Sequence, residues 1–327
     1  MILKHVVVTG ANGFIGRHLC QTLIDAGKQV TACIRDQAEA SLPGRSSGSL
    51  TVSRIPSLDH HDDLLRILQN ADAVIHLAGR AHVMREIEKD PLREFRRVNV
   101  TGTETLASIA LKAGVRRFIY LSSIKVNGEA TEGTAFSADD PPGYSDPYGQ
   151  SKWEAEERLR QIAMGTNMEW VVVRPPMVYG AGVRGNFLSL VKCVFRRIPL
   201  PVGSLNNRRS LVSVYNLCDL LCLLLDQPAA ANSRFLASDR EDISTPDLVR
   251  RIAIALHRSP RILPCPEKVL LMAGVVARQK AAVQRLCSSL VLDREKNTHV
   301  LGWSAPMPLD RGLDRTAEWF LDWAVEQ

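Results

Sequence analysis

The sequence lacks the cysteine patterns that mark a disulfide framework or a zinc site. Its seven cysteines are scattered, odd in number and never spaced as Cys-x-x-Cys. Such usage is typical of proteins from a reducing compartment. Cys218 and Cys222 would share one face of a helix, where buried small hydrophobic side chains are the simpler interpretation. We expect free thiols, no metal site and a cytoplasmic protein.

Hydrophobic runs long enough to cross a bilayer are also missing. Two apolar runs, residues 220–225 and 269–277, fall short of the roughly 20 residues that a transmembrane helix requires. The N-terminal residues pass directly into an apolar strand pattern, without the features of a signal peptide. We therefore predict no integral membrane segment and interpret both runs as buried helices. Contact of the second run with a membrane surface is the alternative.

No block of lysine and arginine is interleaved with aromatic residues, which make up only 6% of the chain. The net charge of +6 and the isoelectric point of about 9.0 would suit either nucleic acid or a small anionic nucleotide. Without such blocks the small anion is favoured, and no nucleic-acid partner is expected. The 327 residues suffice for one large domain or two smaller ones.

What the chain does contain is a regular alternation of strand and helix patterns up to residue 173. After a first apolar run at residues 5–8, β-rich runs at 29–34, 50–55, 73–78, 118–122 and 170–173 alternate with helical patterns at 14–26, 62–69, 95–113 and 148–163. Strands that alternate with helices predict an α/β fold, a Rossmann-type doubly wound parallel sheet.

Three glycines, Gly10, Gly13 and Gly16, follow the first apolar run at intervals of three. In a unit of strand, turn and helix they would supply a left-handed turn, close approach of backbone to a pyrophosphate and tight packing of helix on strand. The N-terminus of the following helix favours a phosphate. This placement predicts dinucleotide binding, with a plain glycine turn as the alternative.

The pattern changes after Arg174, where proline and glycine become frequent and helical patterns at residues 247–256 and 267–278 dominate. We predict a smaller, mostly helical C-terminal substrate lobe made of residues 174–211 and 239–327. Residues 1–173 would form the dinucleotide-binding domain. A helix near 216–226 and a short strand at 234–237 could return to the sheet, so residues 212–238 are assigned to that domain.

Tyr148 and Lys152 are four residues apart in a predicted helix and so lie on one face of it. A lysine ammonium and a helix N-terminus both lower the pKa of a nearby tyrosine hydroxyl from its usual value of about 10, which suits acid–base catalysis. Ser122 and Ser123 end a strand of the same sheet, at the edge where such folds bind ligands. We predict that Ser123 orients a substrate oxygen while Tyr148 exchanges its proton. A solvated tyrosine and lysine pair is the alternative.

These motifs, in this order, resemble the extended short-chain dehydrogenase/reductases, specifically the branch of nucleotide-sugar epimerases and 4-ketoreductases. The resemblance covers essentially the whole chain and implies a catalytic triad of Ser123, Tyr148 and Lys152. The cofactor-binding residues that it implies are Gly10, Asn12, Gly13, Phe14, Ile15, Gly16, Leu77, Ala78, Gly79, Asn99, Ser122 and Pro175, together with Tyr148 and Lys152. It further implies that Asn186 contacts, and Arg209 clamps, the diphosphate of a UDP-sugar substrate.

The sequence also departs from the family pattern. The usual tyrosine after the serine-bearing strand is replaced within residues 125–128, and Asn216 stands where the family has an acidic residue. Lys125 would lie near the substrate, which argues against a simple glucose or galactose specificity; a solvent-facing loop residue is the alternative. Arg208 and Arg209 could likewise be a solvated pair, although a planar guanidinium fits phosphate geometry.

The residues after the second strand bear on the choice of nicotinamide cofactor. An arginine there accommodates the 2′-phosphate of NADP, whereas an acidic residue holds the ribose 2′-hydroxyl of NAD. Arg35 comes first and Asp36 follows it. We therefore prefer NADP, with NAD as the alternative.

Together with the resemblance, these residues predict a 4-ketoreductase of a UDP-4-keto-6-deoxy-N-acetylhexosamine in surface-polysaccharide synthesis. The NADP preference favours this net reduction, because a dissociating reductant suits it. The alternatives are a UDP-hexose or UDP-N-acetylhexosamine 4-epimerase, which recycles its cofactor, and a non-catalytic dinucleotide-binding scaffold or sensor. Relatives commonly form a homodimer through a four-helix interface, which here would use residues 95–113 and 151–163.

Overall fold

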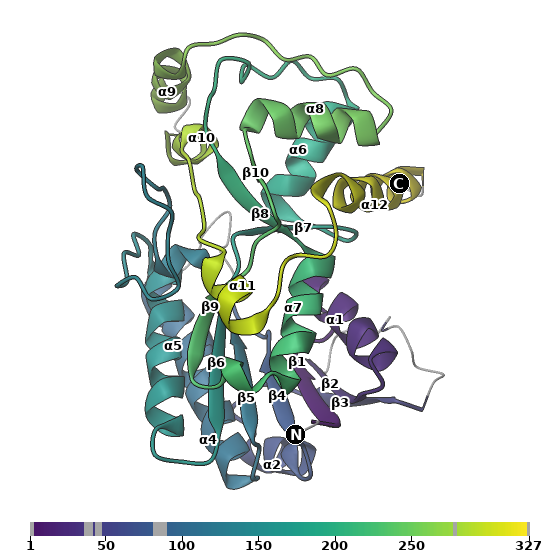
Figure 1. Ribbon diagram of the computed structural model, residues 1–327, viewed down its shortest axis with the longest axis vertical. Coiled ribbons are helices and arrows are strands. Elements are labelled where there is room, and N and C mark those ends of the chain that lie inside the picture. Colours follow the sequence, from purple (N-terminus) through teal and green to yellow (C-terminus); the bar gives the residue numbers. More distant parts are fainter. Residues whose placement is uncertain (1–2, 36–41, 43–47, 81–89, 277–279, 326–327) are drawn as a thin grey trace.

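The structure, a computed structural model, describes residues 3–35, 42, 48–80, 90–276 and 280–325 of the chain. It consists of two lobes (Figure 1). One lobe is built on a large parallel sheet, and the other on a small sheet with helices around it.

Seven strands, each parallel to its neighbours, form the large sheet in the order β3-β2-β1-β4-β5-β6-β9. The order runs outward from β1 in both directions, which defines a doubly wound fold and confirms the predicted fold class. The strands predicted before residue 174 are all present, with ends that differ by at most two residues. They are β1 (His5–Thr9), β2 (Gln29–Arg35), β3 (Leu50–Ile55), β4 (Ala73–His76), β5 (Arg117–Leu121) and β6 (Glu169–Arg174), and β9 (Ser233–Leu236) adds the outer strand.

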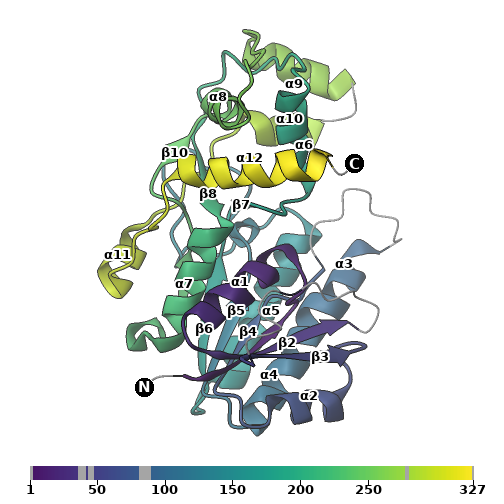
Figure 2. The same ribbon diagram turned by 90° about the vertical axis from the view of Figure 1, so that its right-hand side faces the viewer.

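Helices cover both faces of this sheet (Figures 1 and 2). On one face Leu23 packs in a common core with Leu221, and on the other Leu106 packs with Leu159. Because both faces are covered, the strands are apolar throughout rather than alternating. The first face carries α1 (Phe14–Asp25) and α7 (Val214–Asp226), and the second carries α2 (His61–Leu68), α4 (Gly102–Lys112) and α5 (Pro147–Ala163).

The prediction of a single helix at residues 95–113 is wrong in two respects: the helical structure starts earlier, and it is not α-helical throughout. Helical structure begins at α3 (Pro91–Phe95), where the Asp90 side chain accepts a hydrogen bond from the backbone N–H of Arg93 at 3.1 Å and proline occupies the first turn. A π-helical segment, Arg96–Thr101, then joins α3 to α4. The wider turn contains Asn99, and such segments are frequent at functional sites.

The second lobe has a three-stranded sheet in the order β10-β8-β7. The sequence patterns did not predict β7 (Met177–Tyr179) or β10 (Asp242–Ile243), because both are too short to show a period; β8 is Arg209–Ser213. A separate core includes Phe187, Ile252 and Phe320. The helices of this lobe are α6 (Gly185–Phe195), α8 (Thr245–Ala255), α9 (Glu267–Val276), α10 (Lys280–Cys287) and α12 (Leu309–Val325), while α11 (Glu295–Leu301) lies beside β9.

Helix α9 is not the buried helix that its composition suggested. Val269, Met272 and Val275 are 52%, 71% and 57% exposed. The helix packs on α10 through the opposite face, which carries the buried Leu270 and Gly274, so its other side is largely exposed. The predicted helix extended to residue 278, and residues 277–279 lie outside the described residues. No helix of the described part of the chain is long and apolar enough to cross a membrane.

Gly180 allows the small sheet to lie close to α7, the helix through which the chain returns to the large sheet. Gly180 follows β7 with φ at +146°, a region that side chains rarely enter. A Cβ atom there would lie 2.5 Å from Cγ1 of Val214, the first residue of α7. Both the backbone conformation and the space therefore require glycine.

We expect Gly180→Ala to lower the free energy of unfolding by about 2–5 kcal/mol, because backbone strain and overpacking act together. Gly165→Ala is the matched control, since Gly165 has φ at +74° but no atom within 4 Å of the added Cβ. It should cost about 1–2 kcal/mol, from strain alone. Urea unfolding of the two variants measures the difference, and equal losses would contradict the close contact with Val214.

Candidate active site

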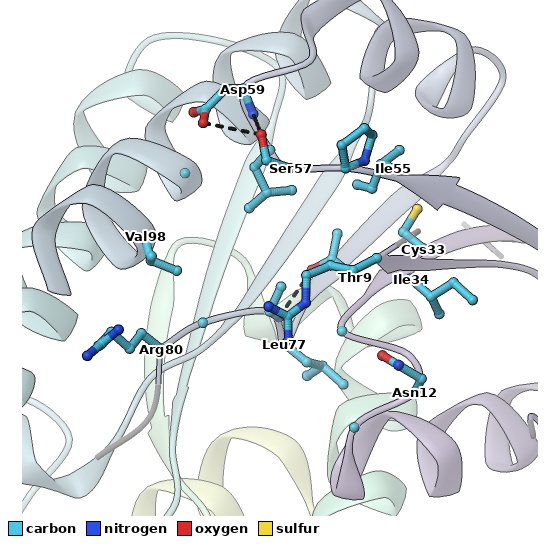
Figure 3. A pocket seen from close by; sticks show the side chains of 18 of the residues that line it. Thr9, Asn12, Cys33, Ile34, Ile55, Ser57, Asp59, Leu77, Arg80 and Val98 are labelled. Carbon is cyan, nitrogen blue, oxygen red and sulfur yellow. Dashed lines mark hydrogen bonds between the residues drawn. The ribbon is translucent and has the colours of Figure 1, made fainter. Parts of the chain in front are cut away.

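A cavity of about 630 Å³ lies at the carboxyl ends of strands β1 to β4 (Figure 3). Asn12 reaches it from the loop after β1, Ile34 from the end of β2, Ile55 from the end of β3 and Leu77 from the loop after β4. Open parallel sheets bind their ligands at this edge. All seven cysteines are free thiols, and the described residues contain no group of three His, Cys, Asp or Glu side chains that could hold a metal ion.

The glycine loop fits a dinucleotide. Gly10 has φ at +69°, and a Cβ atom there would lie 2.9 Å from the backbone nitrogen of Ala78 on the opposite wall of the cavity. A Cβ on Gly16 would lie 2.3 Å from the carbonyl oxygen of Gly10. Gly13 caps α1 without a side-chain hydrogen bond, and no acidic residue stands in the first turn. The N–H groups at this helix end are therefore available to a pyrophosphate.

The other residues of this loop and its opposite wall divide into two kinds. Asn12, Gly13, Leu77, Ala78 and Gly79 line the cavity, as the cofactor prediction requires. By contrast, the side chains of Phe14 and Ile15 are half-buried and pack against the hydrophobic cores. Those two residues could meet a cofactor through the backbone at the start of α1 rather than through their side chains.

Arg35 also lines the cavity, exposed at the end of β2. Its position is the one from which a side chain reaches the adenosine ribose in this kind of fold. Asp36, the other residue that bears on cofactor choice, lies outside the described residues. The choice between NAD and NADP therefore stays a prediction.

Helix α5 carries Tyr148 and Lys152 and begins as the sequence predicts. Asp146 caps it by accepting a hydrogen bond from the backbone N–H of Gly149 at 2.7 Å, and Pro147 occupies the first turn. This start places Tyr148 in the first turn. Its hydroxyl forms a hydrogen bond with the Ser123 side chain. The Lys152 ammonium donates to the carbonyl oxygen of Leu121 at 2.6 Å. The structure thus brings the three proposed catalytic residues to the end of β5.

The structure contradicts the expectation of a lowered pKa for Tyr148. Burial raises the pKa of the Tyr148 hydroxyl to about 12, although the hydrogen bond with Ser123 acts in the opposite direction. Burial also lowers the pKa of Lys152 to about 7, against the attraction of the Glu156 carboxylate. The lysine lies over the Tyr120 ring, 4.1 Å from its centroid. The four-residue spacing in the sequence shows that Tyr148 and Lys152 share a helix face, but it does not show that both side chains are buried.

Sequence reasoning missed Glu156, which lies fully buried one turn beyond Lys152. Its carboxylate accepts hydrogen bonds from the Ser122 hydroxyl at 2.5 Å and from two nitrogens of Arg174 at 2.9 and 2.6 Å. Arg174 is equally buried and also donates to Asn127 at 2.9 Å. Ser122 was predicted to bind the cofactor, but its hydroxyl is committed to this network. The spacing of Glu156 from Lys152, four residues along the helix, was the available signal.

Asn99 and Pro175 both form hydrogen bonds with backbone groups of nearby loops. The Asn99 side chain accepts a hydrogen bond from the N–H of Arg80 at 2.8 Å and donates to the carbonyl oxygen of Arg80 at 3.1 Å and to Ser151 on α5 at 3.0 Å. It therefore fixes the loop that forms one cavity wall. The carbonyl oxygen of Pro175 accepts a hydrogen bond from the N–H of Ile124 at 3.0 Å. That contact joins the chain after β6 to the loop that carries Ser123.

The three predicted substrate residues occupy different surroundings. The Lys125 ammonium contacts Glu129 at 2.8 Å and also Asp146, the residue that caps the helix of Tyr148. Asn186 is exposed at the start of α6. The Arg209 guanidinium donates to the carbonyl oxygens of Arg285 and Ser288, at 2.6 and 2.9 Å, and burial lowers its pKa. Arg209 is thus tied to the end of α10, whereas Lys125 belongs to the loop beside the proposed triad.

Arg208 and Asn216, which lie on either side of β8 in the chain, also contact other protein groups. Arg208 is exposed and pairs with Asp242 at 3.2 Å, so it is closer to the solvated alternative than Arg209 is. Asn216 is fully buried and donates to Asp239 at 2.6 Å and to the carbonyl oxygen of Met307 at 2.9 Å. Asn216 therefore joins α7 to the second lobe.

Comparison with known proteins agrees with this geometry. Residues 6–236 match the model of the NAD dependent epimerase/dehydratase family. A UDP-glucose 4-epimerase from Vibrio cholerae is 40% identical over 321 residues, which cover 97% of this chain and 96% of the relative. An N-acetyl-alpha-D-glucosaminyl-diphospho-ditrans,octacis-undecaprenol 4-epimerase from Escherichia coli O157:H7 is 26% identical, over 96% and 95% of the two chains. The structure of MoeE5 in complex with UDP-glucuronic acid and NAD is 26% identical, with a TM-score of 0.76 over 97% of this chain and 99% of that one.

The chain therefore belongs to the NAD dependent epimerase/dehydratase family, within the extended short-chain dehydrogenase/reductases. The resemblance identified from the motifs is confirmed, and the chain is an enzyme of this type. The roles of the individual site residues stay predictions.

We expect Glu156→Gln to lower the free energy of unfolding by about 3–5 kcal/mol, because it leaves the buried Arg174 without its counter-charge. Glu157→Gln is the control, since Glu157 is 23% exposed and pairs with Arg160 and Arg234 at the surface. It should cost at most about 1 kcal/mol. Chemical denaturation of both variants tests this, and similar losses would show that the Glu156 network contributes no more than a surface pair.

The lowered pKa of Lys152 predicts a pH-dependent stability. Between pH 7 and pH 10.5 the unfolded chain keeps a proton on this lysine that the folded protein has released, so stability rises with pH in that window. The free energy of unfolding of the unsubstituted protein should therefore increase relative to that of Lys152→Met as the pH rises. Lys112→Met, at an exposed position on α4, is the control. A constant difference between the protein and Lys152→Met would contradict the burial effect.

Proposed function

We propose that this protein is an NAD-dependent 4-epimerase of a UDP-linked hexose or N-acetylhexosamine. The observation that carries the proposal is the 40% identity, over nearly the full length of both chains, to a UDP-glucose 4-epimerase. The MoeE5 structure, which contains a UDP-sugar and NAD, supports the same ligand classes. The cavity and glycine loop at the ends of β1 to β4 are suited to hold the dinucleotide.

The proposed triad supplies the acid–base part of this reaction. NAD, when bound, accepts and returns a hydride at the sugar C4 and brings a positive charge to the site. Ser123 would hold the C4 oxygen through its hydroxyl, beside Tyr148. Tyr148 is a protonated hydroxyl at neutral pH, because burial raises its pKa to about 12. It therefore acts directly as a proton donor, and as an acceptor only after a positive charge nearby has lowered that pKa. Lys152, close to the same strand end, provides such a charge when protonated.

The substrate lobe is proposed to hold the UDP group. On this assignment residues 1–173 and 212–238 bind the cofactor, and residues 174–211 and 239–327 bind the nucleotide sugar. Arg209 would contact the diphosphate with the part of its guanidinium that Arg285 and Ser288 do not use. Asn186 and Lys125 would contribute from α6 and from the loop after Ser123. A homodimer through α4 and α5 is part of the same proposal.

A 4-ketoreductase of a UDP-4-keto-6-deoxy-N-acetylhexosamine is the second candidate. The observation that favours it is Arg35, exposed at the rim of the cavity where it could meet the 2′-phosphate of NADP. The same triad would then donate a proton to the carbonyl oxygen. This candidate requires net consumption of NADPH, whereas an epimerase consumes no reductant.

The decisive experiment is to incubate the purified protein with UDP-glucose or UDP-N-acetylglucosamine, without added reductant. We expect the 4-epimer to form. Tyr148→Phe should lower turnover at least about 100-fold while NAD binding is retained, because only the exchangeable proton is lost. An unchanged rate in Tyr148→Phe would contradict the catalytic assignment. NADPH oxidation with a 4-keto sugar and no epimerisation would favour the second candidate. Cofactor binding without either reaction would favour a scaffold.

A further inference from the structure

The exposed side of α9 forms an apolar surface at the end of the second lobe that is farthest from the large sheet (Figure 1). We call it the α9 surface. Leu263, in the segment leading to α9, is 50% exposed, and Met272 is 71% exposed. The opposite side of α9 packs closely on α10, because a Cβ on the buried Gly274 would lie 2.9 Å from Val283. Its apolar members are Leu263, Val269, Met272 and Val275.

Basic residues accompany these side chains in the chain. Residues 258–275 contain Arg258, Arg261 and Lys268 but a single acidic residue, Glu267. Arg261 and Lys268 are exposed next to the apolar members in the chain. A second basic segment is attached to the first, because the N–H of Leu200 donates to the carbonyl oxygen of Arg261 at 2.8 Å and the N–H of Leu263 donates back to Leu200 at 2.9 Å. That segment includes the exposed Arg196, Arg197 and Ile198.

We propose that the α9 surface binds the surface of a lipid bilayer that contains anionic phospholipids. A helix with exposed apolar side chains and flanking cations lies in the membrane interface, with its apolar side in the acyl boundary and its charges at the headgroups. At ten residues α9 is too short to span a bilayer. The long stem of Lys268 can follow the apolar side while its ammonium stays at the headgroups.

The charge of the α9 surface favours a bilayer over a second copy of the chain as its binding partner. A two-fold dimer would place the α9 surface against itself, because such an interface uses the same patch on both subunits. The basic residues of the two copies would then face and repel one another, because Glu267 is the one acidic residue of this stretch. Anionic headgroups neutralise the same residues. The bilayer is therefore the complementary partner, and this inference does not depend on the reaction proposed above.

The test is co-sedimentation of the full-length protein with vesicles of phosphatidylcholine alone or with phosphatidylglycerol added. We expect binding only to the anionic vesicles, weakened by salt. Arg261→Ala combined with Lys268→Ala should lower the affinity roughly 25-fold, at about five-fold for each basic residue near an anionic surface. Val269→Ser combined with Met272→Ser should also release the protein, because it removes the apolar contact.

Met164→Ser is the matched control, since Met164 is 68% exposed but ends α5 in the other lobe. It should bind vesicles like the unsubstituted protein, and all variants should keep the same activity on a soluble substrate and the same size on gel filtration. Failure of the unsubstituted protein to bind anionic vesicles would overturn the proposal. So would equal loss of binding in Met164→Ser, or a change of oligomeric state in the α9 variants with vesicle binding unaltered.

Discussion

The buried ion pair between Glu156 and Arg174 is the contact on which the proposed active site depends. It joins α5 to the end of β6 and, through Ser122, to the end of β5. Tyr148 and Lys152 lie on the same helix as Glu156, and Ser123 follows Ser122 directly. Because neither charge has access to water, the two must be paired for the fold to be stable. The geometry of the triad is thus coupled to the stability of the sheet edge.

Much of the fold and the outline of the site could be predicted because local chemistry determines them. The glycine loop needs a left-handed residue at Gly10 and no side chain at Gly16, and these requirements are visible in the chain. The start of α5 follows from Asp146 and Pro147. Alternating strands and helices led directly to the parallel sheet, since the connecting helices cover both faces of such apolar strands.

Properties that depend on long-range packing could not be predicted in this way. The Tyr148 and Lys152 pKa values are shifted by burial, and burial depends on residues far away in the chain. The side-chain partners of Ser122 and Arg209 are of the same kind, because Glu156 and the end of α10 reach them only in the folded protein. For α9, composition indicated a buried helix, but only the arrangement of its neighbours determines which sides are covered.

Strand β9 joins the large sheet only after the chain has entered and left the second lobe. Neither lobe is therefore one continuous stretch, and several segments run between them side by side. During synthesis, the large sheet cannot be completed until residue 236 has emerged, so its outer edge beside β6 stays open while the helices of the second lobe begin to form. Each crossing is also a covalent link between the lobes, so any movement of one lobe relative to the other must be absorbed at all of the crossings together.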